Sequence, residues 1–135
     1  AMVQLFILCS RYNTKKETET NKYSSTLLRS FKKLIDENYK EKKLTKEYAE
    51  LLYITPNHLN ALCKDVTGQS AGEIIRDRVL LEAKRLLVNS NSNISEIANE
   101  LNFVDNSYFT KFFKKYEGIT PETFKKQFDH KKQNI

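Results

Sequence analysis

The chain has 135 residues, enough for one helical domain or two very small ones but too few for a large multidomain enzyme. Charged residues make up 30% of it, the formal net charge is +6, and there are only three glycines and two prolines. This composition favours an all-α fold and is compatible with a polyanionic partner, although many basic domains bind no nucleic acid. The two cysteines, Cys9 and Cys63, are too few and too far apart for a disulfide framework or a zinc site.

The first 23 residues differ in character from the rest. Ala1 and Met2 look like residues left by cloning ahead of an internal fragment. The apolar segment 3–12 is too short to cross a bilayer and lacks the basic start of a signal peptide. The polar stretch 13–25 predicts a linker. We therefore expect 1–23 to be the end of an upstream domain with its linker, and a folded domain to begin near Ser24.

Hydrophobic periodicity predicts three helices in the first half of this domain. The first covers 25–39, and the second follows Thr45, a good N-cap residue. The third starts at Thr55 with the proline that follows it, and it ends at Gly68. The residues expected to be buried in the second and third helices are Tyr48, Ala49, Leu51, Leu52, Leu59, Leu62, Cys63 and Val66.

Four further helices are predicted in the second half, which gives about seven in all. A long central helix covers 72–88 and is followed by a polar break at 89–93. Ser95 caps the next helix, an aromatic helix ends at Gly118, and the last begins at Thr120 before a second proline. Their expected inner residues are Ile75, Val79, Leu80, Ala83, Leu86, Leu87, Ile97, Ala98, Leu101, Phe109, Phe112, Phe113, Tyr116, Phe124 and Phe128.

Residues 45–75 and 94–124 are two copies of one unit, in register if the second turn has one extra residue. In each copy a small residue lets two short helices approach, and a turn of three or four residues leads into the second helix. This is the helix-turn-helix pattern, whose second helix can lie in a major groove. The aligned pairs are Ala49 with Ala98, Leu52 with Leu101, Ile54 with Phe103, Leu59 with Phe109, Leu62 with Phe112, Cys63 with Phe113, Lys64 with Lys114, Gly68 with Gly118 and Ile74 with Phe124.

The most specific stretch is the second unit, 94–128. It reads I-x-x-I-A, a turn aromatic, S-Y-F, F-K-K, G, T-P and a final aromatic. This closely resembles the signature of the AraC/XylS family of bacterial transcription regulators, and the resemblance extends over about 25–130. It implies a double helix-turn-helix DNA-binding domain over 24–130, with two recognition helices in successive major grooves on one face of DNA. It also implies that the apolar segment 3–12 is the tail of an upstream sensing and dimerising domain. Residues 131–135 are then a basic tail.

The recognition helices are predicted over 56–66 and 106–116. By resemblance, base-reading positions fall on Asn57, Asn60 and Ala61 in the first, and on Asn106, Ser107 and Lys111 in the second. Asparagine can bond an adenine edge, whereas Ala61 stands where relatives often carry arginine and cannot read guanine. The remaining predicted contacts, several of them to phosphates, are His58, Lys64, Thr110 and Lys114. The alternative for His58 is a partly buried packing residue. Amides near Ser95 and Thr120 could also bind phosphates.

A helical protein-interaction module without DNA binding is the alternative function. An enzyme is disfavoured, since His58 and His130 are the only histidines and no glycine-rich phosphate loop is present. We expect no cofactor and no metal, a cytoplasmic location, and double-stranded DNA and RNA polymerase as partners. The upstream domain could be a small-molecule sensor or a phosphorylation-controlled receiver, and the resemblance is compatible with activation or repression.

Overall fold

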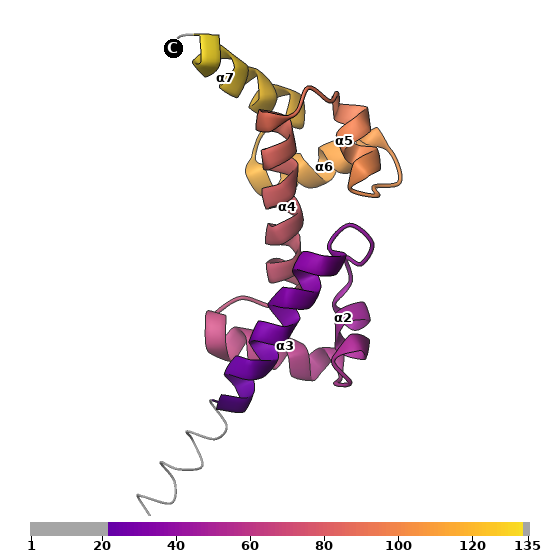
Figure 1. Ribbon diagram of the computed structural model, residues 1–135, viewed down its shortest axis with the longest axis vertical. Helices are drawn as coiled ribbons and strands as arrows, with labels where there is room; N and C mark the ends of the chain where they lie inside the picture. The colour runs from indigo at the N-terminus through magenta and orange to yellow at the C-terminus, as the bar shows by residue number, and fades with distance from the viewer. Residues whose placement is uncertain (1–21, 134–135) are drawn as a thin grey trace, which may run out of the picture.

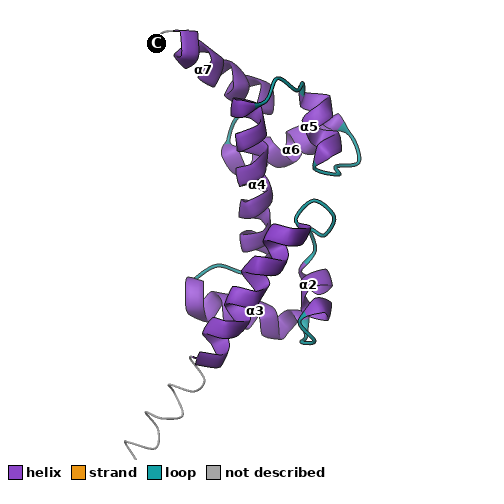
Figure 2. Cartoon of the chain, viewed as in Figure 1, coloured by secondary structure: helices purple, strands orange, loops and turns teal. Residues whose placement is uncertain are grey.

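The computed structural model describes residues 22–133, and these form helices joined by short loops (Figure 2). A helix over 22–38 comes first. The others are α2 (Thr45–Leu51), α3 (Pro56–Thr67), α4 (Ala71–Asn89), α5 (Ile94–Glu100), α6 (Asn106–Glu117) and α7 (Pro121–Gln133). The all-α class with seven helices is thus confirmed for the described part of the chain. None of these helices is long and apolar enough to span a membrane. The predicted segment 3–12 lies outside the described residues.

The first unit consists of helix 22–38, α2, α3 and the start of α4. Phe31 and Tyr48 are fully buried at its centre, and their rings meet edge to face with centroids 5.6 Å apart. Burial raises the pKa of Tyr48 to about 12, and its hydroxyl donates a 2.8 Å hydrogen bond to the carbonyl of Lys42. Since a buried hydroxyl needs a partner, this bond fixes the loop before α2 against the core.

The second unit consists of α5, α6, α7 and the end of α4, and its core is mainly aromatic. Phe109 and Phe113 are fully buried on the inner side of α6. Their ring centroids are 6.1 Å apart, and Phe113 meets Phe124 of α7 at 5.4 Å. The proline that opens α7 follows Thr120, whose hydroxyl accepts a hydrogen bond from the amide of Thr123, as expected for a cap.

The helix α4 belongs to both units (Figure 1). It has 19 residues, so it is about 28 Å long at about 1.5 Å per residue. Ser70 and Glu73 form a reciprocal capping box at its start. Ala71 and Ile75 are part of the first core, whereas Leu80, Ala83 and Leu87 are part of the second.

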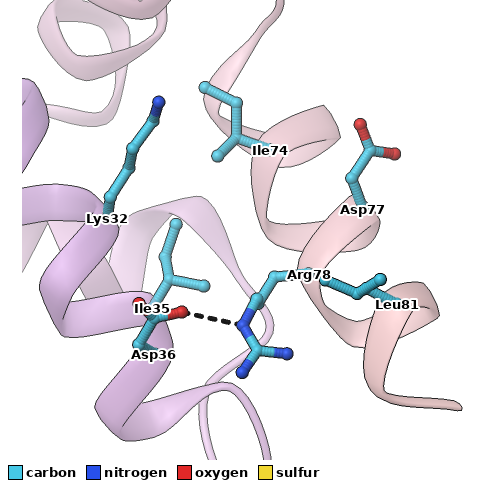
Figure 3. A pocket seen from close by; sticks show the side chains of 7 residues that line it. All are labelled: Lys32, Ile35, Asp36, Ile74, Asp77, Arg78 and Leu81. Atoms are coloured by element: carbon cyan, nitrogen blue, oxygen red, sulfur yellow. Dashed lines mark hydrogen bonds and ion pairs between the residues drawn. The ribbon is translucent and has the colours of Figure 1, made fainter. Parts of the chain in front are cut away.

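A groove of about 280 Å³ separates helix 22–38 from α4 (Figure 3). Arg78 crosses it and donates a 2.7 Å hydrogen bond to Asp36. Arg78 also lies 3.6 Å from Glu82, a buried carboxylate that accepts two hydrogen bonds from Arg85. The bonds from Arg85 hold the pKa of Glu82 below its ordinary value, and the charge is therefore compensated within the fold.

The predicted repeat is confirmed by its backbone hydrogen bonds. The amide of Ile54 bonds the carbonyl of Ala49 at 3.0 Å, and that of Phe103 bonds Ala98 at 2.9 Å. The bonds that end α3 and α6, from the amides of the two C-terminal glycines to Lys64 and Lys114, are both 2.9 Å long. Both glycines have positive φ, 80° and 89°. The extra residue of the second turn is Val104, which is almost fully exposed.

Several helix boundaries differ from prediction. Thr45 is the first residue of α2 rather than its cap, and the N-cap position is taken by Leu44 without a side-chain bond. Asn93, not Ser95, caps α5 through a 2.8 Å bond from the amide of Glu96. The first helix begins at residue 22, inside the stretch 13–25 that the sequence predicts to be a linker.

Three residues predicted to be buried are exposed: Leu51, Val66 and Tyr116. Val66 and Tyr116 lie in the last turns of the two recognition helices, where the chain leaves the core. The ring of Tyr116 is covered on one side by the guanidinium of Arg76, 4.2 Å from its centroid. Hydrophobic periodicity shows which residues share one side of a helix, but not whether the last turn extends beyond the neighbouring helices.

Replacing Phe113 with alanine should lower the free energy of unfolding by about 3–5 kcal/mol, because the ring is fully buried among other aromatic rings. Phe112→Ala should cost less, since that ring is only partly buried. Tyr108→Ala, at an exposed position of the same helix, is the control and should stay within about 0.5 kcal/mol. Urea denaturation measures all three. Equal losses for Phe113→Ala and Tyr108→Ala would contradict this orientation of α6.

Candidate nucleic-acid interface

The inner side of α3 packs into the first core, and its outer side carries exposed polar residues. Thr55 caps the helix by accepting a 3.1 Å hydrogen bond from the amide of His58. Leu59 and Cys63 are completely buried on the inner side. The predicted contact residues Asn57, His58, Ala61 and Lys64 are all exposed. The alternative of a partly buried His58 is therefore wrong.

Asn60 differs from the other predicted contacts of α3. Its side-chain oxygen accepts a 3.0 Å hydrogen bond from the amide of Ala71, and the residue is half-buried. A two-bond contact with adenine needs that oxygen as an acceptor for the base. In this geometry Asn60 instead joins α3 to the start of α4. Base reading by Asn60 would need the second lone pair of this oxygen, or the bond to Ala71 would have to break.

The outer side of α6 has the same construction with different charges. Asp105 caps the helix through a 2.7 Å bond from the amide of Tyr108. Asn106, Ser107, Lys111 and Lys114 are exposed, and Thr110 is half-buried. The structure thus brings the predicted contact residues of the second unit together on one surface of α6.

Two residues that the sequence did not single out also belong to this surface. Tyr108 is 61% exposed, and with Lys111 and Lys115 it lines a hollow of about 250 Å³ on the flank of α6. Their three- and four-residue spacing places all three on one side of the helix. The sequence contains this spacing, but there Tyr108 and Lys115 stand out only as parts of the S-Y-F and F-K-K motifs.

The two recognition helices differ in charge. The surface of α6 presents Lys111, Lys114 and Lys115, and its one acid, Glu117, is paired with Lys84 at 2.7 Å. The surface of α3 presents Lys64 with Asp65 beside it. Phosphate binding should therefore be stronger at α6.

Both helices lie on the same side of the molecule. In the view of Figure 1, α3 passes behind helix 22–38 and α6 passes behind α4, near opposite ends of α4. The length of α4, about 28 Å, is close to one turn of B-DNA, about 34 Å. The groove of Figure 3, between helix 22–38 and α4, contains none of the predicted contact residues.

Comparison with known proteins agrees with this geometry. A family model described as a helix-turn-helix domain matches residues 48–127, more than half of the chain. The chain belongs to the AraC family of helix-turn-helix transcription regulators. The matched range contains both AraC-type recognition helices, α3 and α6, and all of α4.

Similar proteins include the uncharacterized transcriptional regulatory protein YesN of Bacillus subtilis, 31% identical over 116 residues. That alignment covers 82% of this chain but 31% of YesN, so the chain spans about a third of its relative. The C-terminal domain of the two-component response regulator yesN from Fusobacterium nucleatum aligns with a TM-score of 0.67 at 26% identity, over 72% of this chain and 95% of that one. The DNA-binding domain of AdpA, solved with a target DNA, shares the fold, with a TM-score of 0.66 at 15% identity, over 83% of this chain and 97% of that one.

In this AraC-family domain, Lys111→Ala should weaken binding to a selected DNA site by roughly 1–3 kcal/mol, and binding to random DNA by less. The reason is that Lys111 is exposed at the centre of the outer side of α6, where it can reach the edge of a guanine. Fluorescence anisotropy with both duplexes measures the two losses. Equal losses on the two would show that Lys111 contacts only phosphate.

Proposed function

We propose that this chain binds duplex DNA by placing α3 and α6 in successive major grooves on one face. The observation that supports this most is that α3 and α6, both of which carry exposed polar residues, lie on one side of the molecule near opposite ends of α4 (Figure 1). Because α4 contributes to both cores, both helices are packed in units that share this one helix.

The side chains suit different tasks. Lys111 reads a base together with Asn106 and Ser107, while Lys114 and Lys115 bind phosphates. In α3, Asn57 and His58 can bond base edges, and the methyl group of Ala61 can contact a thymine methyl. The outer surfaces of α3 and α6 thus offer amides, hydroxyls and lysines, which suit binding rather than catalysis.

We further propose that the chain acts within a longer, cytoplasmic regulator that contacts RNA polymerase. Residues 1–23 would connect this domain to an upstream sensing and dimerising domain. The alignment with only 31% of YesN supports a longer protein, and the similarity to a response-regulator domain favours a phosphorylation-controlled receiver.

The salt dependence of binding to a random duplex tests the proposed function. The logarithm of the association constant should fall linearly with the logarithm of salt concentration, because phosphate contacts release counterions. Lys114→Ala should reduce the magnitude of the slope by about 0.9. Lys33→Ala, an exposed lysine of helix 22–38, is the matched control and should leave the slope unchanged. Absence of duplex binding at low salt would favour the protein-interaction module instead.

A further inference from the structure

The two helix-turn-helix units touch at a second place besides α4. The loop between helix 22–38 and α2 meets the end of α5 and the turn that follows it. We call the contact among Lys40, Lys43, Leu101 and Asn102 the interunit contact.

Lys43 makes the central bonds of this contact. Its amine donates a 2.8 Å hydrogen bond to the carbonyl of Lys40, in its own loop, and a 2.6 Å bond to the carbonyl of Leu101, in the second unit. The side chain of Lys43 is half-buried, and this burial lowers its pKa. Asn102 completes the contact by donating a 2.9 Å bond back to the carbonyl of Lys40.

Each side of the interunit contact is fixed to its own unit. On the first side, the buried hydroxyl of Tyr48 bonds the carbonyl next to Lys43, that of Lys42. On the second side, the amine of Lys43 lies 5.2 Å from the ring centroid of Phe103. That ring packs against Phe109 and Phe112 of α6, at 5.1 and 5.2 Å. A short series of contacts therefore joins the first core to the second recognition helix.

This second link matters because a single helix can curve or twist along its length. Shifting one half-site by one base pair displaces it by about 3.4 Å and rotates it by about 35° around the DNA axis. If α4 alone connected the two units, they could move relative to each other to fit such shifts. The interunit contact, as a second connection, restricts this movement.

We propose that Lys43 is a positioning residue that fixes the spacing of the two DNA half-sites that this chain accepts. This inference rests on the proposed two-groove binding. Lys43 is not on the DNA-binding surface itself, so it acts through the placement of α6 relative to α3.

Selection of binding sites from a random duplex library tests this inference with the full chain. The wild-type chain should select a paired motif with one spacing, and it should bind duplexes one base pair longer or shorter roughly tenfold more weakly. Lys43→Met keeps an apolar stem of similar length but cannot donate the two bonds. It should select the same half-sites at several spacings, with discrimination reduced to roughly threefold or less.

Two further variants make the test decisive. Lys46→Met replaces an exposed lysine of α2 and should keep the single spacing. Asn102→Gly removes the bond to Lys40 while suiting the positive φ of 60° at this position, so it should broaden the spacing without loss of fold. Circular dichroism confirms the helical content of each variant. Suppose that the wild-type chain selects a paired motif and that Lys43→Met and Asn102→Gly keep its single spacing. This result would overturn the positioning role of Lys43 but not the proposed function. A wild-type selection without a paired motif would overturn the proposed function as well.

Discussion

The arrangement of this molecule depends on one helix that is shared by two hydrophobic cores. The hydrophobic core of each unit is incomplete without α4. Ala71 and Ile75 belong to the first core, and Leu80, Ala83 and Leu87 belong to the second. Because the two groups of residues lie on different sides of the helix, the sequence of α4 determines how the units are rotated relative to each other. The direction of each recognition helix follows from the same packing.

The two surfaces proposed to bind DNA, on α3 and α6, are alike in backbone structure and differ in their side chains. The backbone hydrogen bonds of the helix-turn-helix are repeated in both units, as the bonds to Ala49 at 3.0 Å and to Ala98 at 2.9 Å show. The surface of α6 presents three lysines, whereas in α3 the side-chain oxygen of Asn60 already accepts a hydrogen bond from the amide of Ala71. The two helix-turn-helix units thus share one backbone arrangement but have different exposed side chains. We infer that the two DNA half-sites differ in sequence and in affinity.

Much of the fold could be predicted because it is encoded locally. The apolar spacing of α6, the glycines that end α3 and α6, and the proline after Thr55 each constrain only a few neighbouring residues. What could not be predicted depends on distant partners. The bond of Asn60 joins residues 11 positions apart, and that of Lys43 to Leu101 joins residues 58 apart. The exposure of Val66 and Tyr116 likewise depends on where the core ends, which no local pattern records.

The central claim is that α4 holds two recognition helices at a distance matching one turn of DNA. A crystal structure of the chain bound to a selected duplex measures this most directly. The account predicts that α3 and α6 of one chain occupy adjacent major grooves on one face, with their centres about 34 Å apart. A complex in which only one of the two helices enters a groove, with the other turned to solvent, would contradict it.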